Sequence, residues 1–131
     1  MKNCSRYEHP MSHVLTIDIK KQRLRIYLHA LHDIGDPKYI QLLVNPASRI
    51  LAVRSCREKD KYAQKIYWKT IKDKGQCCEL YSKDLIDGLQ PVLPQTPKPC
   101  SYRIYGKVDY GSARFDLKDA IPIDNEEEPC Q

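Results

Sequence analysis

Six cysteines are the residues of this chain with the clearest potential for chemistry, and they stand at positions 4, 56, 77, 78, 100 and 130. No Cys-x-x-Cys spacing occurs, so the ligand pair typical of structural zinc sites is missing. Cys77 and Cys78 are adjacent, and adjacent residues of a strand point to opposite faces. The spacing therefore predicts free thiols, with neither a metal site nor a disulfide framework.

The histidines and serines do not complete a reactive site either. His29 and His32 share one face of a short predicted helix, but no carboxylate or third ligand follows at metal-binding spacing. Ser82 and Ser112 lack the sequence context of a nucleophile elbow, and the chain has no glycine-rich phosphate loop. We therefore predict a non-enzymatic protein that needs no cofactor and no metal.

The basic residues are the remaining candidates, because the net charge of +5 is unevenly divided. Residues 1–74 contain 16 Lys and Arg against 7 Asp and Glu, which is +9, whereas residues 75–131 contain 6 against 10, which is −4. This asymmetry favours an anionic partner for the first half, and a basic solvated surface is the alternative. Lysines also alternate with Tyr62, Tyr67 and Trp68, as in nucleic-acid-binding segments, although Trp68 aligns with an apolar strand position and is expected in the core.

The N-terminal residues and the hydropathy of the chain bear on its location. Residues 1–13 contain no apolar stretch of the kind found in signal peptides. No apolar run approaches the roughly 20 residues that span a bilayer. We therefore expect a cytoplasmic protein without a membrane partner.

Two stretches of the chain are similar in sequence, and this similarity indicates how its strands and helices are arranged. Residues 14–34 align without gaps with residues 68–88, and the identical pairs are Thr16/Thr70, Ile17/Ile71, Lys20/Lys74, Gln22/Gln76, Tyr27/Tyr81, Leu31/Leu85 and Asp33/Asp87. Internal repeats of this kind indicate that one structural unit occurs twice. A single unit of about 40 residues is too small to bury an adequate core, so we expect the two copies to share one.

The first unit, residues 13–54, alternates apolar and polar residues in two short strands, 14–19 and 23–28, joined by a polar turn. Leu28, Leu31 and Ile34 then recur at helical spacing, and Gly35 and Pro37 end the helix. Strands 39–44 and 49–53 follow, around the turn at residues 45–48. The predicted unit is strand, strand, short helix, strand, strand.

The second unit, residues 68–118, repeats this order after a charged connector at residues 55–67. It carries a proline-rich insertion at residues 90–100, which we expect to lie outside the core because proline has no N–H to donate to a sheet. Closing strands are predicted at residues 102–108 and 113–117. Residues 1–12 are predicted to be a flexible leader and residues 119–131 an acidic tail, of which residues 124–131 have nothing to bury.

The repeated unit resembles the SpoVT/AbrB-type swapped-hairpin domain of bacterial transition-state regulators and MazE-like antitoxins. That family has an Ile-Asp, then Gly-Arg-Ile-x-Ile-Pro, then a short helix ending in Leu-Gly-Ile. Ile17 and Asp18 match the first element, residues 22–27 lie over the second, and residues 31–35 approximate the third. In the family, two chains exchange hairpins to build one small barrel. The resemblance implies that this chain either builds the barrel alone, as a monomeric pseudo-dimer, or forms a homodimer.

The resemblance also implies a function, that of a DNA-binding bacterial transcriptional regulator. By position, the residues facing DNA would be Lys20, Lys21, Arg23, Arg25, Arg49 and Arg54. The alternative is a protein-interaction module of the same fold, antitoxin-like or an accessory of a mobile element, that uses its acidic second half, including Glu126, Glu127 and Glu128, to engage a basic protein partner.

The repeat makes the fold prediction specific. We expect a mainly β protein with short helices, in which the two units are related by a pseudo-twofold axis and share one barrel-like core. The residues predicted to be largely buried are Leu24, Ile26, Leu31, Ile34, Ile40, Leu42, Ile50, Leu51, Cys78, Leu80, Leu85, Ile104, Phe115 and Leu117. Lys20, Lys21, Arg23 and Arg25 are predicted to be exposed together on one side.

Overall fold

A computed structural model describes residues 13–95 and 101–123 of the chain. Its strands are β1 (Val14–Asp18), β2 (Arg23–Tyr27), β3 (Tyr39–Asn45), β4 (Ile50–Cys56), β5 (Gln64–Lys65), β6 (Cys77–Tyr81), β7 (Ser101–Asp109), β8 (Ser112–Asp116) and β9 (Ile121–Ile123). Its helices are α1 (Leu28–Asp33), α2 (Trp68–Lys74) and α3 (Lys83–Leu89), with 3-10 turns η3 (Gln90–Val92) and η4 (Leu117–Asp119). The prediction of a mainly β protein with short helices is confirmed.

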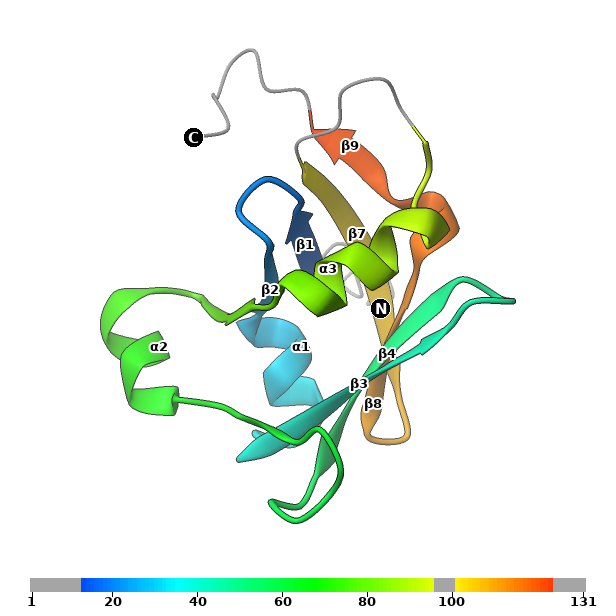
Figure 1. Cartoon of the computed structure of the whole chain (residues 1–131). Coiled ribbons are helices and arrows are strands. Elements are labelled where there is room, and N and C mark those ends of the chain that lie inside the picture. Colours follow the sequence, from blue (N-terminus) through cyan, green and yellow to red (C-terminus); the bar gives the residue numbers. More distant parts are fainter. Residues whose placement is uncertain (1–12, 96–100, 124–131) are drawn as a thin grey trace, which may run out of the picture.

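All the described strands belong to one antiparallel sheet, which curls around the core (Figure 1). The strand order is β5-β3-β4-β8-β7-β1-β2-β6, and β9 pairs with β7 on the edge opposite β1. The sheet therefore mixes strands from the two halves of the chain, because β1 pairs with β7, β2 with β6 and β4 with β8. In the β2–β6 pair, Arg25 lies directly opposite Glu79.

The alternation of side chains in β1 and β2 follows the sequence pattern. Leu15 and Ile17 of β1, and Leu24 and Ile26 of β2, are fully buried, and the residues between them are half-buried on the outer face. Apolar residues from both halves of the chain join these four in one continuous core. Strands of this kind need a buried face on only one side, which the period of two in the sequence supplies.

A strand followed at once by a short helix occurs twice, as β2–α1 and as β6–α3. Gly35 lies just after the end of α1, as the sequence predicted. Its φ is +103°, a left-handed conformation that glycine adopts without steric cost. Ser82 begins α3, and its hydroxyl accepts a hydrogen bond from the Leu85 N–H at 3.1 Å. Both helices end up against the core, through Leu31 in α1 and Ile86 in α3.

The predicted strand at residues 68–72 is wrong, because these residues form α2 at the periphery of the molecule (Figure 1). The alignment with β1 explains the difference, since Lys69 stands where Leu15 is fully buried in the first half. An unpaired lysine cannot be placed in an apolar interior without a large free-energy cost. In α2, Lys69 is exposed, Ile71 is buried, and the Trp68 indole N–H donates to the Pro37 carbonyl at 2.8 Å.

Two predictions about surface segments are wrong in part. Val92 and Leu93, inside the proline-rich insertion, are buried. The proline before them is compatible with this, because Pro91 lies at the start of η3, where no N–H donor is required. Ala120 is buried and β9 pairs with β7, so the sheet extends into the segment predicted to be an acidic tail. The leader at residues 1–12, residues 96–100 and the acidic residues 124–131 lie outside the described residues.

Most of the predicted core is confirmed. Leu24, Ile26, Leu31, Ile34, Ile40, Leu51, Cys78, Ile104, Phe115 and Leu117 are buried. Four residues of that prediction, Leu42, Ile50, Leu80 and Leu85, are only half-buried. Three of them, Leu42, Leu80 and Leu85, line the same groove on the surface, so the error for these three has one structural cause, described below.

Candidate functional site

Lys20 and Lys21 are exposed in the turn between β1 and β2, as predicted. The turn is held by the Asp18 carboxylate, which accepts a hydrogen bond from the Lys21 backbone N–H at 3.0 Å. These two lysines are the part of the predicted basic cluster that the fold presents to solvent.

Arg23 and Arg25 make ion pairs on the outer face of the sheet and are half-buried there, so the prediction that they are solvent-exposed is wrong. An Arg23 Nη2–Asp18 Oδ2 contact of 3.1 Å joins β2 to β1, and an Arg25 Nε–Glu79 Oε2 contact of 2.8 Å joins β2 to β6. Only 13% of the Arg23 side chain and 33% of the Arg25 side chain is exposed. The cause is that β2 lies between two strands that both carry an outward carboxylate.

Arg49, in the turn before β4, and Arg54, in β4, also make contacts within the chain. Arg49 Nε donates to the Val92 carbonyl at 2.9 Å, and Arg54 Nε donates to Gln41 Oε1 at 3.0 Å. Three strands, β8, β7 and β1, separate the strand that carries Arg54 from the strand that carries Arg23. The six predicted cations therefore do not form one surface.

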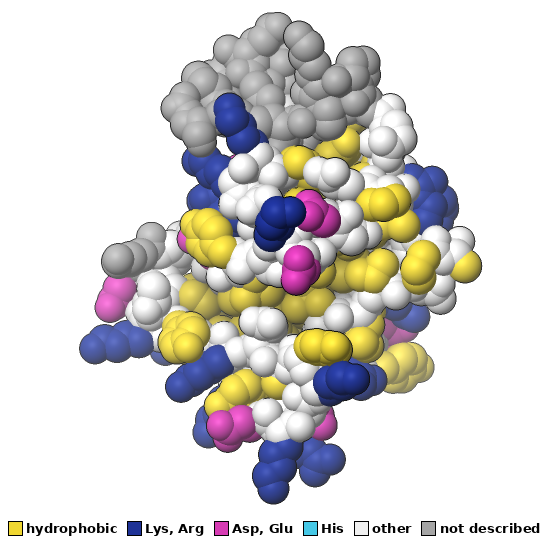
Figure 2. Space-filling model, viewed as in Figure 1, with side chains coloured by type: hydrophobic (Ala, Val, Ile, Leu, Met, Phe, Trp, Pro, Cys, Tyr) yellow, Lys and Arg dark blue, Asp and Glu magenta, His cyan; other side chains and the backbone are white. Residues whose placement is uncertain are grey.

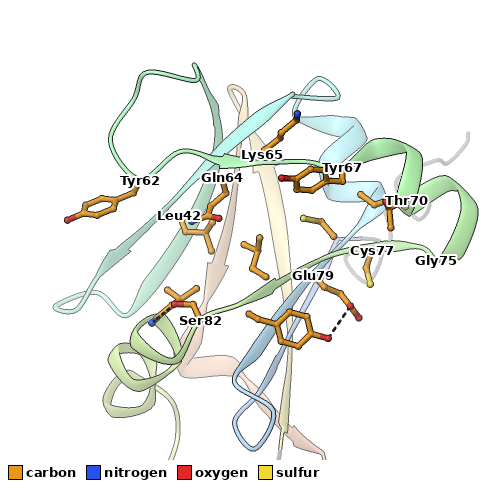
Figure 3. Close-up of a pocket in the computed structure, with 15 residues that line it drawn as sticks. Leu42, Tyr62, Gln64, Lys65, Tyr67, Thr70, Gly75, Cys77, Glu79 and Ser82 are labelled. Carbon is orange, nitrogen blue, oxygen red and sulfur yellow. Dashed lines mark hydrogen bonds between the residues drawn. The ribbon is translucent and has the colours of Figure 1, made fainter.

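A groove of about 800 Å³ lies between β5 and β6, the two ends of the strand order, and the sequence did not predict it (Figure 3). In Figure 3 the strand carrying Gln64 and Lys65 and the strand carrying Cys77 and Glu79 run along opposite sides of the groove, with Leu42 between them. Its apolar lining consists of Leu42, Ile71, Cys78, Leu80 and Leu85. Figure 2 shows hydrophobic side chains gathered across the middle of this face of the molecule.

The edge of β6 that faces the groove has no strand partner among the described residues. Backbone hydrogen bonds join Leu28 N–H to the Gln76 carbonyl and Ser82 N–H to the Gln22 carbonyl, both at 3.0 Å. Because antiparallel pairs alternate between bonded and non-bonded positions, the backbone groups of Cys78 and Leu80 face β2. Those of the alternate residues, at positions 77, 79 and 81, therefore point toward the groove.

The opposite wall is also a strand edge. Ile66 N–H donates to the Lys38 carbonyl at 2.9 Å, so by the same alternation Gln64 bonds to β3 and the backbone groups of Lys65 point away from it. Within residues 13–95 and 101–123, the groove is thus bounded on both sides by strand edges that have no strand partner. Such edges are templates for pairing with another chain.

Three tyrosines stand around this groove with large exposed areas. Tyr62, Tyr67 and Tyr81 are 77%, 63% and 63% exposed. Lys61 Nζ lies 5.3 Å from the Tyr62 ring centroid and Lys65 Nζ lies 5.4 Å from that of Tyr67, while the Tyr81 hydroxyl donates to Glu79 Oε1 at 3.3 Å. Tyrosine supplies contact area at low cost in side-chain entropy and is enriched at the centres of protein interfaces.

The thiols in the groove are poor nucleophiles. Burial, with smaller contributions from Cys77 and Glu79, raises the pKa of Cys78 to about 11, and burial also raises the pKa of Cys77. Cys77 lies on the outer side of β6 and Cys78 on the buried side, as predicted. Within residues 13–95 and 101–123, no group of three or more His, Cys, Asp or Glu side chains is placed to hold a metal ion.

One sequence feature could have indicated the groove. In the internal alignment, Lys69 takes the position of the apolar Leu15.

No helix in the described part of the chain is long and apolar enough to cross a membrane. Comparisons with protein-family models, with characterised proteins and with solved structures find no match for this chain.

Proposed function

We propose that this chain is a non-enzymatic protein-interaction module that binds a segment of another protein in the groove between β5 and β6. The observation that carries the proposal is an apolar groove bounded by two unpaired strand edges and surrounded by three exposed tyrosines. Apolar surface together with unsatisfied backbone groups is the combination that recognition by strand addition uses.

The same proposal includes the tandem architecture. Antiparallel pairing of β2 with β6, centred on Arg25 opposite Glu79, and of β4 with β8 supports two units related by a pseudo-twofold axis. Arg25 and Glu79 are equivalent positions in the internal alignment, so a twofold axis would pass between them. The fold would then be a degenerate swapped-hairpin barrel of the AbrB-like type, open at one seam.

A peptide library displayed on phage and selected with the full chain tests the function. Tyr62 and Tyr110 form a matched pair of exposed tyrosines, 77% and 97% exposed, both with positive φ, and asparagine tolerates that backbone conformation. Selected peptides should bind Tyr62→Asn roughly tenfold more weakly, and Tyr110→Asn as tightly as the parent chain. Selection of no peptide, or equal binding by both variants, contradicts the proposal.

DNA binding is the second proposal, and it rests on the exposed Lys20 and Lys21 together with the +9 charge of residues 1–74. The engagement of Arg23, Arg25, Arg49 and Arg54 in contacts within the chain weakens its support. A DNA-binding chain should lose affinity steeply as salt rises, and Lys20→Gln with Lys21→Gln should reduce that dependence. Undetectable binding to duplex DNA at low salt would remove this proposal.

A further inference from the structure

The arrangement around β1 shows how a strand fills a seam of this sheet. β1 lies between β2 and β7 and pairs antiparallel with both. Its side chains Leu15 and Ile17 point into the core and are fully buried, while Thr16, directly opposite Arg25, stays on the outer face. The seam needs one strand of five residues with two apolar side chains on the inner face.

The free edge of β6 offers the same backbone pattern that β2 offers to β1. Because Leu24 and Ile26 bond to β6, the backbone groups of Arg23, Arg25 and Tyr27 face β1. In β6 the groups that face the groove belong to Cys77, Glu79 and Tyr81, which are the same three positions of the internal alignment. A strand antiparallel to β6 would therefore find donors and acceptors at the spacing that β1 uses.

The segment of the chain that aligns with β1 does not occupy this place. Residues 68–72 are in α2. If they formed a strand beside β6 instead, Lys69 would take the position that corresponds to the buried Leu15 of β1. With that strand displaced, the half-buried Leu42, Leu80 and Leu85 line a groove instead of a closed core.

From this geometry we infer that the groove binds an extended segment of a partner polypeptide as a strand antiparallel to β6, in the position that β1 has beside β2. The inference rests on the proposed function and specifies its ligand. The segment has five residues, with apolar side chains at the second and fourth positions, which contact Leu80 and Cys78. Its central residue lies opposite Glu79 on the outer face and is a hydroxyl or basic residue, because a second carboxylate there would repel Glu79.

The probe is a synthetic peptide with the sequence of residues 13–20, which contains the β1 sequence, and its binding to the full chain is measured by fluorescence anisotropy. In the inferred register the N–H of peptide residue Thr16 donates to the Glu79 carbonyl, whereas the N–H of peptide residue Leu15 points away from β6. Methylation of the Thr16 nitrogen should therefore weaken binding by roughly tenfold. Methylation of the Leu15 nitrogen should have a much smaller effect.

A change of charge at the central residue of the peptide tests whether that residue lies opposite Glu79. The peptide with Thr16→Glu should bind the parent chain several-fold more weakly than the original peptide. That difference should vanish in the Glu79→Gln chain, because the repelling carboxylate is gone. An undiminished difference in Glu79→Gln would place the peptide elsewhere and overturn the inference.

The remaining outcomes separate this inference from the function on which it rests. If library peptides bind at Tyr62 but the strand probe does not bind at about 1 mM, or loses equal affinity on methylation at either nitrogen, strand pairing is rejected while the interaction module stands. If sedimentation velocity shows a dimer that the probe cannot dissociate, a second copy occupies the β6 edge and the inferred partner is wrong. Alternating sensitivity to methylation, in a monomeric chain, supports the inference.

Discussion

The two flanks of the β2–β6 pair differ in one strand. Beside β2, β1 closes the sheet and buries Leu15 and Ile17 completely. Beside β6, the aligned residues form α2, and a groove of about 800 Å³ remains. Residues 14–18 and residues 68–72 align in sequence, yet the first segment is a strand and the second lies in a helix.

We attribute the difference to Lys69, which would face the interior of the sheet if residues 68–72 formed a strand. Residues 68–72 keep Thr70 and Ile71 in common with β1, and both are β-branched residues that suit a strand. Lys69 opposes this local preference, because its ammonium group would be buried without a partner. The helix satisfies both residues at once, with Lys69 in solvent and Ile71 in the core.

The largest effect on stability is expected when a lysine is placed in β1. Leu15→Lys should destabilise the folded state by more than about 4 kcal/mol, because it puts an unpaired charge where the native side chain is fully buried. Urea denaturation followed by circular dichroism measures the change. Leu15→Met, which conserves volume, should cost less than about 1.5 kcal/mol. Similar losses for both variants would contradict the role assigned to the charge.

The helices that follow β2 and β6 allow a second comparison. Leu31→Ala in α1 should lower the free energy of unfolding by about 2–5 kcal/mol, because Leu31 is fully buried. Leu85→Ala in α3 should cost only about 1 kcal/mol, since Leu85 is half-buried beside the groove. Thermal and urea unfolding of both variants give the two values. Equal losses would mean that the groove is closed in solution.

Replacing Lys69 with leucine should have the opposite effect on residues 68–72. In Lys69→Leu, residues 68–72 carry the apolar pattern of β1, so we expect them to leave the helix and pair with β6. Backbone chemical shifts measured by NMR would report the change from helix to strand, and the strand probe would lose its site. Lys72→Leu alters an exposed lysine of the same helix and should leave α2 in place. A helical segment 68–72 in Lys69→Leu would contradict the explanation.

The smallest expected effect concerns the thiols of β6, which stand where β2 has Arg23 and Leu24. Thiolate is the form that reacts with iodoacetamide, and a pKa of about 11 leaves roughly a thousandth of Cys78 ionised at pH 8. Its alkylation rate should keep rising with pH until about pH 11. Single Cys77→Ser and Cys78→Ser chains, analysed by mass spectrometry, separate the two rates, and Cys77 should react faster. Rapid labelling of Cys78 near pH 8 would show that β6 is more open than described.

The β1–β2 hairpin and the helix α1 were predictable because their sequence signals are local. Alternation in residues 14–28 predicted β1 and β2, and Gly35 with Pro37 predicted the end of α1. Residues 91–93 were misjudged because the prolines masked Val92 and Leu93, whose burial depends on contacts formed after α3. The exposure of Arg23 and Arg25 was misjudged because their partners, Asp18 and Glu79, come from two different strands.

Local sequence patterns predict the class of fold, the strand-then-helix order of both halves, and the alternating core residues, since each depends on neighbours within a few positions. They do not predict that β6 pairs with β2, that residues 68–72 form a helix outside the sheet, or that a groove opens between β5 and β6. The physical reason is that these outcomes depend on burial, and burial is a property of segments distant in the chain. A lysine is compatible with a strand in isolation, and its cost appears only when the position it occupies becomes the interior of the sheet.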